Sequence, residues 1–259
     1  MHVASFSTGL SSAVMVERLL TRYGKDAVTV VCMDTTIEDD DNYRFANDCA
    51  LHWGVNIVWL REGRDPYQVG VDEHVIPNQK LAPCTKRLKI EPFTNYLKAM
   101  PGALTVHIGF DFSEVHRCAA TDKAYTARGW AVDYPLLWKP LEFRPYVEVV
   151  RAWGIEPPRM YGMGYTHANC GGRCVKQGKG DWLRTLVHFP ERFAQAEEWE
   201  QKMRLNPTNA NYAFLRDQTE GVVRPFTLRQ LREEHSAGLS LPLFALDQAS
   251  ACVVCGVGN

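Results

Sequence analysis

Residues 3–14 constrain the fold more than any other part of the chain. A short apolar segment leads into small and hydroxyl-bearing residues from Ser7 to Ser12, and apolar residues then recur at helical spacing from Val14. This pattern predicts a strand, a tight turn and a helix, with Ser11 or Ser12 as the N-cap. Unpaired N–H groups and the helix dipole attract anions to a helix start. The turn therefore predicts a phosphate site in an α/β protein.

Bulk composition excludes some classes of protein. With 46% hydrophobic residues among 259, the chain can bury a sizeable core. The 29 basic and 30 acidic residues give no net charge that calls for nucleic acid or an anionic membrane. No apolar run approaches transmembrane length, and the N-terminus enters a strand at once. We expect a cytoplasmic protein, in which clustered cysteines indicate metal or redox chemistry.

The spacing Ser7-x-Gly9-x-x-Ser12 resembles the PP-loop of the adenine nucleotide alpha-hydrolase group. That group includes ATP pyrophosphatases and the phosphoadenosine phosphosulfate (PAPS) and adenosine phosphosulfate (APS) reductases. Thr8 and Ser11 stand where the usual loop has Gly and Asp. The resemblance implies a phosphate cradle formed by Ser5, Ser7, Thr8, Gly9, Ser11 and Ser12.

The resemblance also implies the architecture. We expect a doubly wound, mainly parallel α/β sheet of about five strands with helices on both faces. A nucleotide-binding domain would span residues 1–155, and a cysteine-containing, mainly helical region would span residues 156–259. Residues 62–82 lack periodicity and are predicted to be a long loop with short helical pieces. Helices are expected at 190–204 and, with Thr227 as N-cap, at 228–234.

Two further strand ends carry candidate ligands for the nucleotide. The apolar run 27–33 ends at Asp34 and Thr35, where Asp34 could accept hydrogen bonds from adenosine or simply cap a turn. The strand at 104–108 ends at Gly109, which gives a nucleotide access to the backbone.

The residues after Gly109 resemble a Gly-x-x-x-x-Glu-x-x-Arg element that lies near base and ribose in the family. Asp111, Glu114 and Arg117 are its candidates here. The alternative is an exposed turn with an ion pair. The resemblance implies that Arg117 also stabilises developing negative charge.

A basic cluster follows Cys84. Lys86, Arg87 and Lys89 could hold phosphate or sulfate and lower the pKa of the thiol, or they could be exposed residues of a helix start. The string resembles the Cys-Cys-x-x-Arg-Lys-x-x-Pro element of APS reductases, with Thr85 in place of the second cysteine. The resemblance implies catalytic roles for Cys84, Lys86, Arg87 and Lys89.

Two cysteine pairs predict a metal centre. Cys170 and Cys174 flank a glycine-rich turn, and Cys252 and Cys255 form a Cys-x-x-Cys knuckle near the C-terminus. Four thiolates fit a [4Fe–4S] cluster or Zn²⁺, and Cys84 is an alternative ligand. The region around Cys170 resembles the Tyr-x-x-Gly-Tyr-x-x-x-x-Cys-x-x-Cys segment of APS reductases, which favours the cluster, whereas the knuckles alone favour zinc.

Together, these features predict an enzyme that adenylates an acceptor with ATP and Mg²⁺ and couples this step to sulfur transfer. A sulfonucleotide reductase acting on PAPS or APS is the second reading. A nucleotide-binding subunit without turnover, in a nucleic acid modification or defence complex, is the third. Candidate partners are a tRNA or DNA acceptor, which a basic strip of Lys176, Lys179 and Arg184 could contact, a protein sulfur donor and a second copy of the chain.

Overall fold

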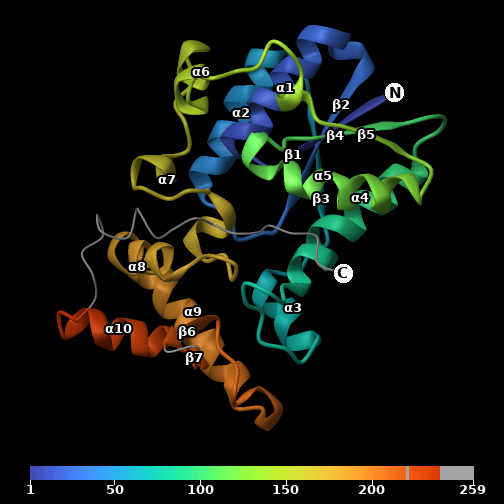
Figure 1. The fold of residues 1–259 in the computed structure, drawn as a ribbon. Coiled ribbons are helices and arrows are strands. Elements are labelled where there is room, and N and C mark those ends of the chain that lie inside the picture. Colours follow the sequence, from blue (N-terminus) through green and yellow to red (C-terminus); the bar gives the residue numbers. More distant parts are fainter. Residues whose placement is uncertain (220–221, 240–259) are drawn as a thin grey trace.

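The computed structural model describes residues 1–219 and 222–239 (Figure 1). Within these residues, five strands form one parallel sheet in the order β3-β2-β1-β4-β5. The strands are β1 (His2–Phe6), β2 (Val28–Asp34), β3 (Ile57–Arg61), β4 (Thr105–Ile108) and β5 (Ala131–Asp133). The predicted doubly wound α/β fold is confirmed.

Helices cover both faces of this sheet: α1 (Leu10–Tyr23), α2 (Asp40–Trp53), α4 (Glu91–Ala99), α5 (Cys118–Thr126) and α6 (Tyr146–Ala152). Val30 and Cys32 of β2 point to the face covered by α1, α2 and α6. Val31, between them, points to the face covered by α4 and α5. Successive strand residues point to opposite faces, which is why β2 reads as a continuous apolar run.

The strand order reverses at β1, which has β2 on one side and β4 on the other. The chain winds from β1 through β2 to β3 and then crosses to β4 and β5. In open α/β sheets, ligands bind beyond the carboxyl ends of the strands at such a reversal. The turn after β1 and Gly109 after β4 lie at this position.

A second core lies below the sheet in Figure 1. Its elements are α3 (Pro66–Asp72), α8 (Lys179–His188), α9 (Pro190–Arg204), α10 (Leu228–Ser236) and an antiparallel hairpin of β6 (Leu215–Thr219) and β7 (Val222–Phe226). At its centre, Phe214 stacks on Trp182 and Phe193 meets Trp182 edge to face. The predicted helices are confirmed, and Thr227 caps α10 with a reciprocal bond to Gln230. No sequence pattern predicts the hairpin.

The predicted loop at 62–82 contains α3, and this segment belongs to the second core. Tyr67 of α3 is buried against Trp199 and Phe214, and its hydroxyl donates to the Arg173 carbonyl at 2.9 Å. The N-terminal part of the chain therefore supplies core residues to the C-terminal part. The boundary between residues 155 and 156 stays a prediction.

Short elements complete the described chain: η1 (Lys25–Ala27), η2 (Thr85–Ile90), η3 (Phe112–Arg117), η4 (Pro135–Leu137), α7 (Arg159–Gly162), η5 (Asn169–Gly172) and η6 (Pro207–Asn209). Of these, η2 is a π-helical turn that runs into α4. None of the helices in the described ranges has the length and apolar character needed to cross a bilayer.

Candidate functional site

The turn between β1 and α1 keeps its polar groups at the helix start but uses a different cap from the one expected. Gly9, not Ser11 or Ser12, is the N-cap, and no side chain caps α1. Thr8 before it is left-handed, with a φ of 58°. Ser11 and Ser12 lie in the first helical turn, at the positive end of the helix dipole.

The hydroxyl of Ser12 organises this turn. It accepts hydrogen bonds from the N–H and the hydroxyl of Ser7, both at 3.1 Å, and donates to the Gly9 carbonyl at 2.9 Å. Tyr161 of α7 closes the turn from the other side, where its hydroxyl accepts the Leu10 N–H at 3.4 Å. The shape of the turn is therefore fixed by the protein itself.

A cavity of about 320 Å³ lies beyond the strand ends, as expected at the reversal of strand order. Its lining consists of residues at or just after the ends of β1, β2 and β4, together with residues of η2 and η5. The predicted site residues that line it are Ser5, Ser7, Gly9, Ser11, Ser12, Thr35, Cys84, Lys89, Gly109, Glu114, Arg117, Cys170 and Cys174. Residues far apart in the sequence thus share one chamber.

Asp34 ends β2 but turns its carboxylate into the protein. One oxygen accepts from the Thr36 N–H and the Tyr43 hydroxyl, both at 2.8 Å, and the other pairs with Arg61 at 2.7 Å. The side chain is fully buried and does not line the cavity. This placement matches the alternative reading of a turn residue, and the expected contact with adenosine stays a prediction. Thr35 provides the cavity wall at this strand end.

The basic cluster after Cys84 divides between the surface and the cavity. Lys86 is exposed. Arg87 pairs with Glu73 at 2.5 Å and with Glu91 at 2.8 Å, on the outside of the helix. Of the three cations only Lys89 lines the cavity. Within this segment, Lys89 is therefore the cation that borders the cavity.

Thr8 and Asp111 also lie outside the cavity lining. The Thr8 hydroxyl donates to the Ser7 carbonyl at 2.7 Å. Asp111 caps η3 by accepting from the N–H and hydroxyl of Ser113, at 2.9 and 2.7 Å. Both side chains shape the loops that carry the site, and their direct contact with a nucleotide stays a prediction.

Two hypotheses are open for the loop that carries Arg117: contact with the nucleotide, and an ion pair in a turn. The position of Arg117 is compatible with both. Arg117 forms the ion pair with Glu114, and both residues line the cavity. Its guanidinium lies over the Phe110 ring, 4.0 Å from the centroid. Its Nε is buried and has no hydrogen-bond partner within the described chain. A buried donor without a partner favours a ligand oxygen at this position.

Three thiols face the same cavity. A hydrogen bond with Cys174, burial and the nearby Glu38 carboxylate raise the pKa of the Cys170 thiol. Burial and the neighbouring Cys170 raise the pKa of Cys84 to about 11, although Lys89 acts in the opposite direction. The expectation that the basic cluster lowers the pKa of Cys84 is therefore wrong, because desolvation outweighs the cations.

Sequence reasoning missed several cavity residues. Met33 is the next-to-last residue of β2 and Ile108 is the last residue of β4. Phe93, Phe110 and Tyr125 add apolar surface to the cavity, and no motif marks them. Lys176 lines the cavity instead of belonging to a basic strip on the surface. The proposed strip does not form, since Lys179 pairs with Glu234 and Arg184 is buried beside Asp181.

Comparison with known proteins assigns the N-terminal part of the chain. Residues 1–111 match the family described as phosphoadenosine phosphosulfate reductase domain. The matched residues include β1 to β4 of the sheet, which places this part of the chain in the PAPS reductase-like group. The predicted membership of the PP-loop group is confirmed by this match.

Two individual proteins resemble the chain. An uncharacterized protein of Methanocaldococcus jannaschii is 29% identical over 96 residues, which cover 37% of this chain and 19% of that protein. The chain therefore matches less than a fifth of this relative's length. A PAPS reductase of Candida auris, solved as a phosphate complex, is 16% identical, with a TM-score of 0.45 over 64% of this chain and 78% of its own.

The described residues contain only part of the predicted metal centre. Cys84, Cys170 and Cys174 line one cavity, and soft thiolates suit iron–sulfur clusters and zinc. In residues 1–219 and 222–239, however, no three His, Cys, Asp or Glu side chains are arranged to hold a metal ion. Cys252 and Cys255 lie outside the described residues. The four-cysteine site therefore stays a prediction.

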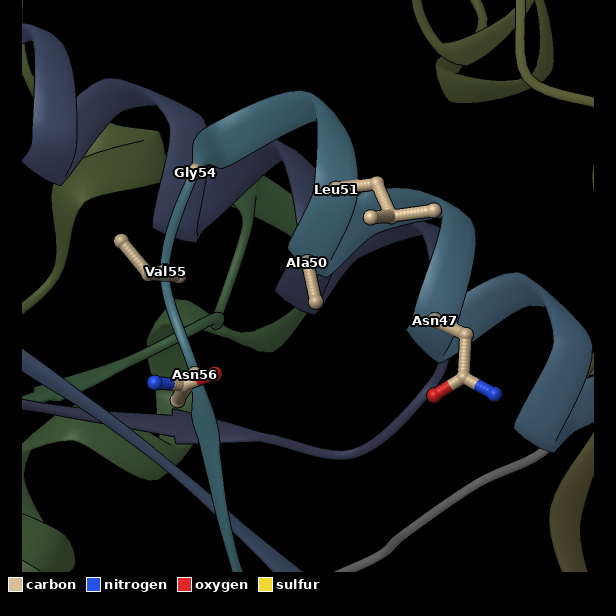
Figure 2. Close-up of a pocket in the computed structure, with 6 residues that line it drawn as sticks. All are labelled: Asn47, Ala50, Leu51, Gly54, Val55 and Asn56. Carbon is tan, nitrogen blue, oxygen red and sulfur yellow. The ribbon is translucent and has the colours of Figure 1, made fainter.

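Figure 2 shows a second hollow, at the C-terminal end of α2, far from the carboxyl ends of the strands. It has a volume of about 500 Å³ and is lined by Asn47, Ala50, Leu51, Gly54, Val55 and Asn56. None of these side chains is ionisable, and Leu51 is exposed. None of the predicted site residues lines this hollow.

Proposed function

We propose that this protein binds ATP in the cavity at the strand ends and adenylates an acceptor in a reaction coupled to sulfur transfer. The observation that carries the proposal is the shared cavity, in which the Ser7–Ser12 turn and the thiols of Cys84, Cys170 and Cys174 face the same space. A phosphate cradle beside thiols suits chemistry that joins phosphate activation to sulfur.

The two ends of the cavity suit the two parts of a nucleotide. Ser7, Gly9 and Ser12 sit at the start of α1, where backbone amides and the helix dipole favour phosphate. Phe93 and Phe110 offer apolar surface for a base. The name of the family that residues 1–111 match contains an adenine nucleotide, phosphoadenosine phosphosulfate. This name supports adenine as the base.

In the proposed first step, an oxygen of the acceptor attacks the α-phosphorus of ATP. A new oxygen–phosphorus bond forms, the bond between the α-phosphorus and the oxygen of the β-phosphate breaks, and pyrophosphate leaves. Lys89 and Arg117 stabilise the negative charge that develops on the phosphate oxygens. The terminal sulfur of a persulfide donor then attacks the acceptor carbon, a carbon–sulfur bond forms, and the carbon–oxygen bond to AMP breaks. A second thiol attacks the donor's sulfur, which breaks the sulfur–sulfur bond, leaves the sulfur on the acceptor as a thiolate and forms a disulfide with the donor.

A sulfonucleotide reductase is the second candidate, and the position of Cys174 beside Cys170 favours it. In that reaction a thiolate attacks the sulfur of the PAPS or APS sulfo group, the sulfur–oxygen bond to the nucleotide breaks, and a second thiol releases sulfite by forming a disulfide. The Cys170 and Cys174 thiols interact with each other and line the same cavity, which supports the formation of a disulfide between them.

A [4Fe–4S] cluster, or Zn²⁺ in its place, would be held by Cys170 and Cys174 with Cys84 or the C-terminal cysteines. Its contribution when bound would be to hold these sulfurs in a fixed arrangement beside the nucleotide. The protein's own residues carry the binding and orientation steps described above.

Three assays on anaerobically purified full-length protein separate the candidates. ATP is incubated with and without bulk tRNA, and AMP and pyrophosphate are quantified. PAPS and APS are incubated with a dithiol reductant, and sulfite is quantified. Visible absorbance and metal analysis identify the centre. AMP plus pyrophosphate supports adenylation, and sulfite supports the reductase. Tight ATP binding with neither product supports a nucleotide-binding subunit without turnover and overturns the proposal.

A further inference from the structure

The carboxylate of Glu38 bridges the nucleotide cavity and the turn that carries Cys170. One oxygen accepts from the Thr35 hydroxyl at 2.9 Å, and the other accepts from the Cys170 N–H at 2.7 Å. Thr35 is buried and lines the cavity, and its Oγ1 lies 3.8 Å from the Cys170 sulfur. Glu38 itself does not line the cavity. Its influence on the site therefore passes through these two neighbours.

The Cys170 backbone has a conformation that needs such support. Its φ is 51° and its ψ is 31°, in the left-handed region that residues other than glycine rarely adopt. Gly171 follows with a φ of 57°. Conformations of this kind persist where the surrounding structure holds them. The hydrogen bond from the Cys170 N–H to Glu38 is charge-assisted and is a direct restraint on this residue.

Asn42 ties the same carboxylate to the segment before Cys170. Its side-chain nitrogen donates to Glu38 at 3.3 Å and to the Ala168 carbonyl at 2.5 Å. Asn42 is buried at the start of α2, so the support comes from a rigid element. The loop after β2 and the cysteine turn, distant in the sequence, are thereby held as one unit.

We infer that Glu38 is a positioning residue whose hydrogen bonds hold Cys170 in its left-handed conformation and keep the thiol against Thr35 at the cavity wall. This inference rests on the proposed function, in which Cys170 is a reactive or ligating thiol beside the nucleotide. The Glu38 carboxylate bonds to the Cys170 N–H and the Thr35 hydroxyl, so it acts by placing Cys170.

Two substitutions separate the hydrogen bonds of Glu38 from its charge. In Glu38→Gln, the amide oxygen can still accept the Cys170 N–H, and the amide nitrogen can donate to the Thr35 hydroxyl. In Glu38→Ala, both bonds are lost. We expect iodoacetamide to modify Cys170 about tenfold faster in Glu38→Ala and within about twofold of the wild-type rate in Glu38→Gln, since a charge-assisted bond restrains opening by about that factor.

The experiment uses the reduced full-length protein as purified, with modification of each cysteine quantified by mass spectrometry. Cys32 and Cys49, buried in the sheet core, are internal controls, because they become reactive only when the domain opens globally. Their rates should not change. Glu156→Ala, which removes an exposed carboxylate elsewhere, is the matched control variant. Hydrogen exchange of the peptide that contains Cys170 reports the same restraint independently of thiol chemistry and should accelerate only in Glu38→Ala.

Three results would overturn the inference. Cys170 could keep its wild-type rate in both measurements, Cys32 and Cys49 could accelerate together with it, or Glu38→Gln could behave like Glu38→Ala. AMP and ATP affinities are measured on the same samples and should stay within about threefold of wild type in Glu38→Ala. Failure of the wild-type protein to bind either nucleotide would reject the proposed function, whereas the comparison at Cys170 would still decide the role of Glu38.

Discussion

Gly109 lies so close to Ser12 that a Cβ at residue 109 would be 3.2 Å from the Ser12 Cα and 3.4 Å from its nitrogen. The end of β4 and the first turn of α1 are therefore in backbone contact across the reversal of strand order. A glycine is required by this close approach and not by its dihedral angles, because the φ of Gly109 is not positive.

Gly109→Ala should damage both the fold and the site. The added methyl group meets backbone and not a flexible side chain, so we expect a loss of about 1–3 kcal/mol in the free energy of unfolding. Displacement of the α1 start should also weaken ATP binding. Urea denaturation and equilibrium binding measure the two effects. Gly162→Ala is the matched control, because a Cβ added at residue 162 would have no neighbour within 4 Å, and its stability should be unchanged or slightly raised. Equal behaviour of the two variants would show that the contact with Ser12 is unimportant.

Ser12→Ala should open the phosphate turn. The substitution removes the acceptor for the N–H and hydroxyl of Ser7 and the donor to the Gly9 carbonyl. We expect a cost of about 1–3 kcal/mol in unfolding free energy and about a tenfold loss in ATP affinity. Thr21→Ala, at an exposed position of the same helix, should change neither quantity. Unchanged affinity in Ser12→Ala would argue against a phosphate site at this turn.

Local patterns are sufficient to predict where the strand ends lie, but not which side chain faces the ligand. The apolar run before Asp34 marks β2 clearly. Successive residues at a strand end point in opposite directions, so a shift of one residue decides between Asp34, which is buried against Arg61, and Thr35, which lines the cavity. The sequence contains no local signal for Tyr43 and Arg61 as partners of Asp34, because both come from other elements.

Long-range packing sets the remaining features. Tyr67 lies in a segment whose lack of periodicity predicts a loop, yet it is buried by residues far along the chain. Lys176 reaches the cavity because the η5 turn folds back on the strand ends. In the basic cluster, the π-helical turn has wider i→i+5 spacing than an α-helix, so ordinary helical periodicity does not predict that Lys89 alone faces inward.

Only one of the three cations in the basic cluster lines the cavity, so substitutions of the other two are controls for its role in ATP binding. Lys89→Ala removes the one cation of this cluster that lines the cavity and should weaken ATP binding about tenfold or more, as expected for a charged contact with phosphate. Lys86→Ala, at an exposed position, should leave affinity within about twofold of wild type. Arg87→Ala breaks surface ion pairs with Glu73 and Glu91 and should cost less than about 1 kcal/mol in stability without changing affinity. A comparable loss of affinity in all three variants would mean that the whole cluster contacts the nucleotide.

His107 should make the fold sensitive to acid. It is fully buried in β4, its Nε2 lies 2.9 Å from the Nδ1 of His2, and burial lowers its pKa from 6.5 to about 4. The folded state therefore binds fewer protons than the unfolded chain between these values, so stability is lost as the pH falls from about 6.5 toward 4. The shift corresponds to a loss on the order of 3 kcal/mol over that range. Urea midpoints at a series of pH values measure it.

The variant His107→Gln keeps a neutral hydrogen-bonding group toward His2 and should flatten this dependence. Glu200 acts in the opposite sense, because burial raises its pKa to about 7 and its folded form gains stability as the pH falls toward 4.5. The difference between wild type and His107→Gln cancels that contribution, and His188→Gln, at an exposed position of α8, should retain the wild-type slope. Glutamine does not titrate in this range, so His107→Gln removes the contribution of the imidazole to the pH dependence. An identical loss of stability at acid pH in wild type and His107→Gln would show that His107 is not its cause.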